Sequence, residues 1–231
     1  MLEKIEIYLR RYPELRSFAA WRLLKRMYMF GLKFFSLNRG LKRELYPGVL
    51  FRVSYASRHT MEADFGVTSK WDVPCLDLIR RWTADNQHAC FFDVGANHGQ
   101  FALVVSRWLD PETKRVFAFE PHPDNCRVLQ ENLRRAASRN VEVVGVALAD
   151  RIGNMTLHGE SVTASLQANV AGGQGTEHIV QVETMDAFCT RMGCMPDVIK
   201  IDVEGFELDV LRGAVATLNR QQSSIKIICE M

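Results

Sequence analysis

From residue 90 onward the chain alternates short apolar runs with stretches of helical periodicity. Such an alternation is typical of βαβ units, in which parallel strands form one sheet. The run at 141–148 is nearly continuous in apolar residues, which suits a strand whose sheet is covered by helices on both faces. We therefore predict an α/β fold with a mostly parallel sheet. The predicted strands lie at about 90–94, 115–119, 141–148, 197–202 and 225–229, and the predicted helices at about 100–109, 124–138 and 206–219.

An additional segment at 151–185 separates the third predicted strand from the fourth. Its stretches 154–158 and 178–183 alternate polar and apolar residues, and a Gly-rich patch lies between them at 172–175. This pattern predicts a β-hairpin insertion after the third strand. Because the insertion leaves the carboxyl end of a strand, we expect it to lie over the edge where open α/β sheets bind ligands.

The first ninety residues follow a different pattern. At 14–37, apolar and aromatic residues recur at steps of three and four, which predicts an amphipathic helix. Residues 46–70 contain short strand-like runs around Pro47-Gly48 and are interpreted as a hairpin or lid, and residues 71–83 resume helical spacing. We divide the chain into a helical extension at 1–45, a connecting segment with a helix at 46–89, and a main domain at 90–231.

The charge is distributed unevenly. Apolar residues make up 47% of the chain and charged residues 24%, as in an ordinary globular protein. Residues 1–43 carry eleven Lys and Arg against three Asp and Glu, so a net charge of +2 for the whole chain leaves −6 for the remainder. The basic helix at 14–37 either packs on the main domain or lies in a membrane interface. Packing is the commoner use of such a helix, and charge alone is a weak signal for a nucleic-acid partner, which we do not expect.

Cysteine usage and the amino terminus indicate the compartment. The six cysteines are scattered, and the closest pair, Cys189 and Cys194, lacks the CxxC spacing of a redox or zinc site. No secretory signal is recognised. Basic residues interrupt the apolar stretch at 18–37, which therefore contains too few consecutive apolar residues to span a membrane. We expect a cytoplasmic protein, with 14–37 as the segment that would contact a membrane peripherally. The sequence does not indicate an oligomeric state.

The first candidate motif is DVGANHGQ at 93–100, which follows the first predicted strand. Gly95 allows a backbone conformation closed to other residues, and the helix that begins near Gly99 offers free N–H groups to an anion such as a carboxylate. Asp93 could accept a hydrogen bond from a ligand ammonium group. The spacing is neither GxGxxG nor a P-loop, and a tight turn without a ligand is the alternative.

The second motif places Glu120 at the end of the second predicted strand, twenty-five residues after Gly95. An acidic residue at about this distance from a glycine turn, ~20 residues, commonly holds the two hydroxyls of a ribose. Asp124 or Asn125 is expected to cap the helix that follows.

The third motif contains Asp202 and Glu204, which follow the fourth predicted strand and face the same edge of the sheet. Two carboxylates so placed could bind a metal or act as a base. Alternatively, they cap the next helix and pair with Lys200. A metal needs three or more ligands, and only these two are adjacent, so we predict no metal site.

In their order along the chain, these motifs resemble the FkbM-type methyltransferases, class I enzymes that use S-adenosylmethionine (SAM) and mostly O-methylate sugars, lipids and polyketide-like metabolites. The resemblance covers roughly residues 90–230 and rests on DVGANHGQF, FAFEPHPDNCRVLQENL, VALADRIGNMTL, IVQVETMDAF and DVIKIDVEGFELDVLRGA. It implies a Rossmann-like class I methyltransferase fold with SAM as cofactor. By this likeness the cofactor-binding residues are Asp93, Gly95, Asn97 and Gly99 at the methionine end, Glu120 at the ribose, and Ala147 and Asp202, with Asp202 and Glu204 as catalytic residues on the substrate side.

The sequence departs from the family pattern at its end. Met231 follows the fifth predicted strand directly, where the family continues with a helix and a two-stranded hairpin. Either the protein is shortened or the sequence is a fragment of a longer one; loss of the hairpin would expose a sheet edge unless another element covers it. This departure is the reason to keep a second hypothesis, a catalytically silent SAM-binding or regulatory protein.

The acidity of an alcohol restricts the mechanism. The pKa of an alcohol is ~16 and that of a carboxylic acid ~4. The gap of ~12 units corresponds to about 16 kcal/mol, so a carboxylate cannot fully deprotonate the acceptor alcohol before methyl transfer. A carboxylate must take the proton as the methyl group moves; His98, His122 and Glu230 are further candidates for the base. The fourth strand lacks the Asn/Asp-Pro-Pro-aromatic motif of enzymes that methylate base amino groups. We predict O-methylation of a hydroxyl on a small molecule, a sugar or a lipid-linked glycan.

Overall fold

A five-stranded parallel sheet forms the centre of the protein. The computed structural model of the 231-residue chain describes residues 40–58, 72–84, 86, 89–158, 177–220 and 225–230. The chain divides into two units, 1–41 and 42–231, and nearly all described residues belong to the second. In the order β10-β9-β3-β4-β5, every neighbouring pair of strands is parallel. These strands are β3 (Cys90–Val94), β4 (Arg115–Phe119), β5 (Val141–Val144), β9 (Val198–Ile201) and β10 (Lys226–Cys229).

The strand order contains one reversal. From β3 the chain adds β4 and β5 on one side, and it then returns to place β9 against the opposite side of β3. Ligands of open α/β sheets bind outside the carboxyl ends of the strands at such a reversal. The order confirms the predicted Rossmann-like fold and places the crevice at the ends of β3 and β9.

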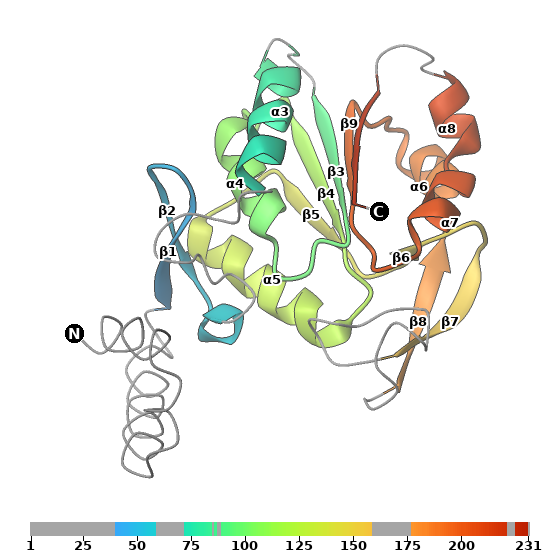
Figure 1. Ribbon diagram of the computed structural model, residues 1–231, viewed down its shortest axis with the longest axis horizontal. Coiled ribbons are helices and arrows are strands. Elements are labelled where there is room, and N and C mark those ends of the chain that lie inside the picture. The colour runs from blue at the N-terminus through green and yellow to red at the C-terminus, as the bar shows by residue number, and fades with distance from the viewer. Residues whose placement is uncertain are drawn as a thin grey trace, which may run out of the picture. The chain divides into compact units, whose positions relative to one another are not determined.

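Helices cover both faces of the sheet, as predicted. Figure 1 shows α3, α4 and α5 on one face and α6, α7 and α8 on the other. The helices are α3 (Asp72–Ala84), α4 (Gln100–Trp108), α5 (Pro123–Ala136), α6 (Met185–Met192), α7 (Glu207–Arg212) and α8 (Val215–Arg220).

The insertion after the third strand is a hairpin, as predicted. Strand β7 (Gly153–His158) pairs antiparallel with β8 (Glu177–Glu183), and β6 (Ala147–Leu148) pairs parallel with β8. The prediction of one strand at 141–148 is wrong, because this run contributes β5 to the central sheet and β6 to the small one. The chain turns locally between the two strands, where the Val146 N–H donates to the Val144 carbonyl oxygen over 2.9 Å.

Two predictions about helices also need correction. The single helix expected at 206–219 is divided into α7 and α8 around Gly213, where a Cβ atom would lie 1.9 Å from the carbonyl oxygen of Ala149. Helix α6 was not predicted: it begins at Met185, the last residue of the range interpreted as the insertion, and fills the stretch before the fourth predicted strand. Its signals are local: the Thr184 hydroxyl accepts a hydrogen bond from the Ala187 N–H over 3.1 Å, and Gly193 closes the helix in the left-handed conformation.

The described residues before the main domain begin with a hairpin of β1 (Leu41–Tyr46) and β2 (Val49–Val53), followed by a 3-10 turn at Tyr55–Arg58. Strand β1 therefore begins within the range 1–45 that the sequence predicts as the helical extension. The hairpin is joined to α5, since Asn132 Oδ1 accepts a hydrogen bond from the Ser54 N–H over 2.6 Å. The helix predicted at 14–37 lies outside the described residues. Among the described helices, none combines the length and the apolar composition that crossing a membrane requires.

Phenylalanines pack between the sheet and α6. The ring of Phe188 lies 4.8–5.5 Å, centroid to centroid, from the rings of Phe92, Phe117 and Phe119, and all four side chains are buried. Edge-to-face aromatic pairs add about 0.5–1.5 kcal/mol each to the free energy gained from burying their area. This cluster fixes α6 on the strands that carry the candidate site.

Candidate functional site

The loop between β3 and α4 has left-handed backbone at three positions: Gly95 (φ 76°), Asn97 (φ 49°) and Gly99 (φ 89°). A Cβ atom on Gly95 would lie 1.8 Å from the backbone oxygen of Asp202, and one on Gly99 would lie 2.2 Å from Leu129 Cδ1. Glycine reaches this conformation at no steric cost, and asparagine tolerates it better than most residues. These positions form a tight turn, which lies directly against the end of β9.

A buried ion-pair network lies beneath this loop. Asp93 is fully buried, and its Oδ2 accepts a hydrogen bond from the Ala102 N–H over 3.0 Å. Lys200 Nζ lies 3.5 Å from Asp93 Oδ1 and 3.1 Å from Asp202 Oδ2, and it donates to the Gly95 carbonyl oxygen over 3.1 Å. Burial by itself would lower the pKa of Lys200, but the two carboxylates outweigh it and raise this pKa, so the ammonium group stays protonated. The carboxylate of Asp93 thus binds the first turn of α4 directly and stabilises the loop through Lys200. Its contact with a ligand ammonium group stays a prediction.

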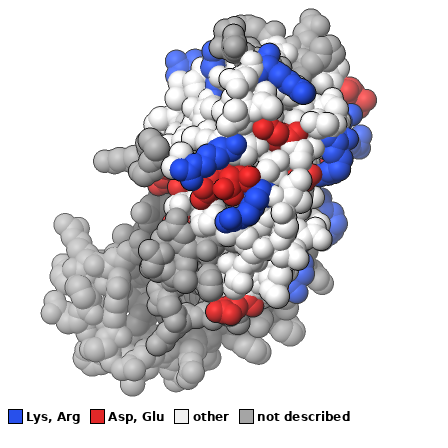
Figure 2. All heavy atoms as spheres, turned by 90° about the vertical axis from the view of Figure 1, so that its right-hand side faces the viewer, with Lys and Arg blue, Asp and Glu red and all other residues white. Residues whose placement is uncertain are grey.

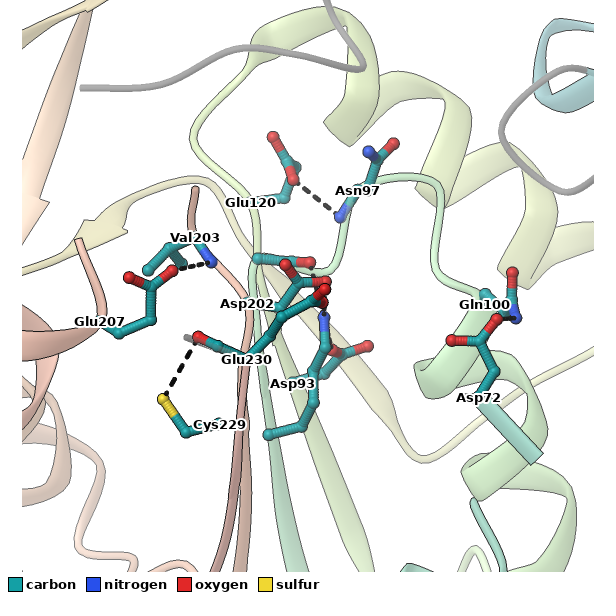
Figure 3. Close-up of polar contacts among 12 residues, drawn as sticks. Asp72, Asp93, Asn97, Gln100, Glu120, Asp202, Val203, Glu207, Cys229 and Glu230 are labelled. Atoms are coloured by element: carbon teal, nitrogen blue, oxygen red, sulfur yellow. Dashed lines mark hydrogen bonds and ion pairs between the residues drawn. The ribbon is translucent and has the colours of Figure 1, made fainter. Parts of the chain in front are cut away.

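The alternative interpretation of the third motif was that its carboxylates pair with Lys200 and cap the next helix, and only the first part is confirmed. Asp202 does pair with Lys200, but neither predicted carboxylate caps α7. Instead, Glu207 Oε1 accepts hydrogen bonds from the N–H groups of Val203 (3.2 Å) and Gly205 (3.0 Å), the first of which is drawn in Figure 3. Glu204 is exposed with φ 49°.

Glu120 holds the turn from the neighbouring strand. It is only 5% exposed, and its Oε2 accepts a hydrogen bond from the Asn97 N–H over 2.7 Å (Figure 3). Its Oε1 accepts from the His122 N–H over 2.9 Å and from Asn125 Nδ2 over 3.2 Å. Burial raises the pKa of Glu120, and these three donors oppose the shift. The first and second motifs are therefore joined through one carboxylate.

The cap of α5 differs from the prediction. Nδ1 of His122 accepts the hydrogen bond from the Asp124 N–H over 3.2 Å, so His122 is the N-cap residue. Asp124 pairs with Arg127 at the surface over 2.9 Å, and Asn125 faces Glu120. Both residues expected to cap the helix have other partners.

Three histidines belong to the first two motifs or contact them. His98 and His122 are buried, and burial lowers the pKa of His98 to about 4. The ring of His122 contacts that of His178, on the insertion strand β8, at a centroid distance of 4.7 Å. This contact confirms that the insertion reaches the edge at which the strands of the central sheet have their carboxyl ends.

Several buried polar atoms around Glu120 lack a hydrogen-bond partner in the described part of the chain: Asn97 Oδ1, His98 Nδ1 and His122 Nε2. Since His122 Nδ1 accepts a hydrogen bond, its Nε2 carries the hydrogen and is a donor. Leaving such atoms unpaired costs about 1–3 kcal/mol each. A polar ligand with both donor and acceptor groups would satisfy them.

A small pocket, partly open to solvent, lies at the ends of β9 and β10. Figure 3 shows Asp202 and Glu230 directed toward one another there, while Gln100 Nε2 donates to Asp72 Oδ2 over 3.0 Å. The lining residues are Asp72, Cys75, Phe101, Lys200, Ile201, Asp202, Ile228 and Glu230.

The predicted site residues do not all meet in this pocket. Asp202 lines it, whereas Ala147 is buried in the small sheet beside Val182 and Phe206. Asp72 and Cys75 were missed, because α3 precedes the motifs by many residues and carries no signal of its own. Within the ranges that the structure describes, no three His, Cys, Asp or Glu side chains converge as metal ligands would.

Charges on the face shown in Figure 2 are mixed. It is the right-hand side of Figure 1, and Lys and Arg lie there next to Asp and Glu. Ion pairs on α6 and α7 include Arg191–Glu183 (2.7 Å) and Arg212–Asp209 (2.9 Å). The described part of this face does not form the continuous basic patch typical of nucleic-acid binding.

Residues 93–231 match the family described as Methyltransferase FkbM domain. The hexuronic acid methyltransferase AglP of Haloferax volcanii is 31% identical over 170 residues, which are 71% of this chain and 66% of that protein. Methyltransferase 1 of Beauveria bassiana is 29% identical over 143 residues, 52% of this chain and 56% of the relative. The chain thus covers less than two thirds of the length of either relative. Among solved structures, methyltransferase FkbM from Methylobacillus flagellatus is similar with a TM-score of 0.44 and 21% identity, over 61% of this chain and 32% of that one.

Proposed function

Because the chain belongs to the FkbM methyltransferase family, we propose that it transfers the methyl group of SAM to a hydroxyl group on a small molecule, a sugar or a lipid-linked glycan. The observation that carries this proposal is the joining of the glycine turn to Glu120. The Asn97 N–H donates to the Glu120 carboxylate over 2.7 Å, and unpaired buried polar atoms lie beside it.

These residues fit the cofactor. The sulfonium methyl group of SAM supplies the electrophile when it is bound. Glu120 would hold a ribose hydroxyl: a carboxylate has about four acceptor positions, and protein donors fill three of them. We therefore expect one strong ribose contact rather than the two expected from the sequence. Asn97 Oδ1 and His122 Nε2 are available for the remaining polar groups of the nucleoside.

Asp202 lies on the acceptor side of this site. It lines the pocket at the end of β9, next to the turn that contains Gly95. Glu204 is exposed, whereas Asp202 lines the pocket and pairs with Lys200, so of the two predicted catalytic carboxylates we favour Asp202 for contact with the acceptor. Alignment of donor and acceptor by these fixed elements supplies several kcal/mol toward the reaction.

A sugar acceptor is supported by the similarity to a hexuronic acid methyltransferase. The pocket contains the carboxylates of Asp72, Asp202 and Glu230. Carboxylates are acceptors for the hydroxyl groups of a sugar. The hypothesis of a silent SAM-binding protein makes the opposite prediction on turnover and is tested in the same experiment.

The experiment combines cofactor binding with turnover. Isothermal titration with SAM is expected to give micromolar affinity, and SAM labelled in its methyl group is expected to transfer label to a glycan-containing lysate extract. Binding without transfer to any fraction would favour the silent SAM-binding protein, and absence of binding would refute both hypotheses.

Peripheral membrane contact through residues 14–37 is a separate proposal, based on their basic and aromatic composition. Co-sedimentation of the full chain with vesicles that contain anionic lipid tests it. If the chain does not sediment with these vesicles at low ionic strength, the proposal is wrong.

A further inference from the structure

The ends of β9 and β10 bring two carboxylates together. The two strands pair in parallel register, with Cys229 opposite Ile201, and the Glu230 N–H donates to the Ile201 carbonyl oxygen over 3.1 Å. Asp202 and Glu230 therefore follow aligned strand ends, and both line the pocket (Figure 3).

The two carboxylates have different surroundings. Asp202 Oδ2 lies 3.1 Å from Lys200 Nζ, and Lys200 is buried and also contacts Asp93. The ion pair with the Lys200 ammonium holds one carboxylate oxygen of Asp202 in place. Glu230 forms no ion pair with any residue that the structure describes, and its side chain is free to approach an acceptor in the pocket.

We infer that Glu230 is the catalytic carboxylate that takes the proton of the acceptor hydroxyl, while Asp202 is a positioning residue held by Lys200. This inference rests on the proposed function. The acceptor oxygen forms a bond to the methyl carbon as the carbon–sulfur bond breaks and its electron pair goes to sulfur. The hydroxyl proton passes to a carboxylate oxygen of Glu230, which becomes neutral, and the positive charge of the sulfonium is lost in the same step.

The charged groups around Glu230 support this assignment. The negative charge of Asp202 raises the pKa of Glu230, burial adds to the shift, and Lys200 opposes it; Glu204 and Asp72 raise it further. A base with a raised pKa holds a transferred proton more firmly, which favours general base catalysis near neutral pH.

The first experiment titrates Glu230 directly and needs no acceptor. The full chain is labelled with 13C at the glutamate side-chain carboxyl carbons, and the Glu230 signal is assigned by its loss in Glu230→Gln. We expect a pKa above that of an ordinary glutamate, which falls in Asp202→Asn. A Glu230 signal that titrates like an exposed glutamate in both proteins overturns the inference.

The second experiment measures turnover with methyl-labelled SAM and a panel of nitrophenyl glycosides that includes a glucuronide. Glu230→Gln is expected to lower kcat about 100-fold with unchanged affinity for SAM, and to remove the fall of kcat at acidic pH. The matched control is Glu112→Gln, an exposed position before β4 at the opposite edge of the sheet, which keeps the wild-type profile. If Glu230→Gln retains kcat and its acidic limb, Glu230 is not the base. Failure of the wild-type protein to bind SAM would refute the proposed function instead, and the titration would still decide the state of Glu230.

Discussion

The backbone oxygen of Asp202 occupies the place that a side chain on Gly95 would need, since a Cβ atom there would lie 1.8 Å from it. This contact joins the turn after β3 to the end of β9, the two strands between which the order of the sheet reverses. The turn that we propose as the cofactor site and the strand that ends at Asp202 are therefore in direct backbone contact.

The first prediction concerns this contact. Gly95→Ala forces β3 and β9 apart or unwinds the turn, so affinity for SAM is expected to fall by more than tenfold, as measured by isothermal titration. Gly48→Ala is the matched control, because Gly48 has nearly the same φ (75° against 76°) but nothing within 4 Å of its Cβ position. The control should lose about 1 kcal/mol of stability from backbone strain and retain SAM binding. Equal affinity of the two variants for SAM would contradict the prediction.

The second prediction tests the carboxylate of Glu120. Glu120→Gln replaces one acceptor oxygen by an NH₂ group and leaves at least one of the three buried donors unpaired, at a cost of about 1–3 kcal/mol. Affinity for SAM is expected to fall about tenfold, and adenosine, which shares the ribose, should lose affinity by a similar factor. Glu142→Gln, at an exposed position on β5, is the control. A normal affinity for adenosine in Glu120→Gln would show that Glu120 does not contact the ribose.

The third prediction concerns the buried lysine. Lys200→Met leaves Asp93 buried without its cation, so the free energy of unfolding in urea is expected to fall by about 3–5 kcal/mol. The double variant Asp93→Asn with Lys200→Met should recover part of this loss, because the unpaired charge is gone. Additive effects of the two substitutions would mean that the side chains do not interact.

The fourth prediction is a pH dependence of stability. The pKa of His98 falls from 6.5 to about 4 on folding because the ring is buried. Between these pH values the unfolded chain binds a proton that the folded protein does not, so stability falls as pH decreases through this window. The contribution is roughly 3 kcal/mol at most, at ~1.36 kcal/mol per pKa unit. His98→Gln should flatten the decrease in Tm between pH 6.5 and pH 4, measured by calorimetry. An unchanged slope would count against this assignment.

Much of the fold could be predicted from periodicity, because strands buried on both faces are apolar runs and their helices are amphipathic. The division of 141–148 into β5 and β6 could not be predicted in this way, because both halves are apolar and they differ only in the sheet that each joins. Helix α6 has only eight residues, too few for a periodic signal to stand out. Its packing on the sheet through Phe188 is a tertiary property.

The sequence predicts those residues of the candidate site that directly follow the ends of strands. Glu120 and Asp202 were found because parallel strands bring their carboxyl ends to one edge of the sheet. The sequence predicts the pair of Lys200 with Asp202 but not its pair with Asp93. Spacing along one strand does not show which residue of the neighbouring strand lies opposite. Asp72 reaches the pocket from α3, and nothing in the local sequence indicates that approach.

The hydrogen bonds that Glu120 makes to the Asn97 and His122 N–H groups have a consequence for the kinetics of cofactor association. A loop already held in one conformation loses little conformational entropy when a ligand arrives. The on-rate for SAM should then be set by diffusion and by the access route, without a slow ordering step, and differences in affinity among variants of this loop should appear mainly in the dissociation rate.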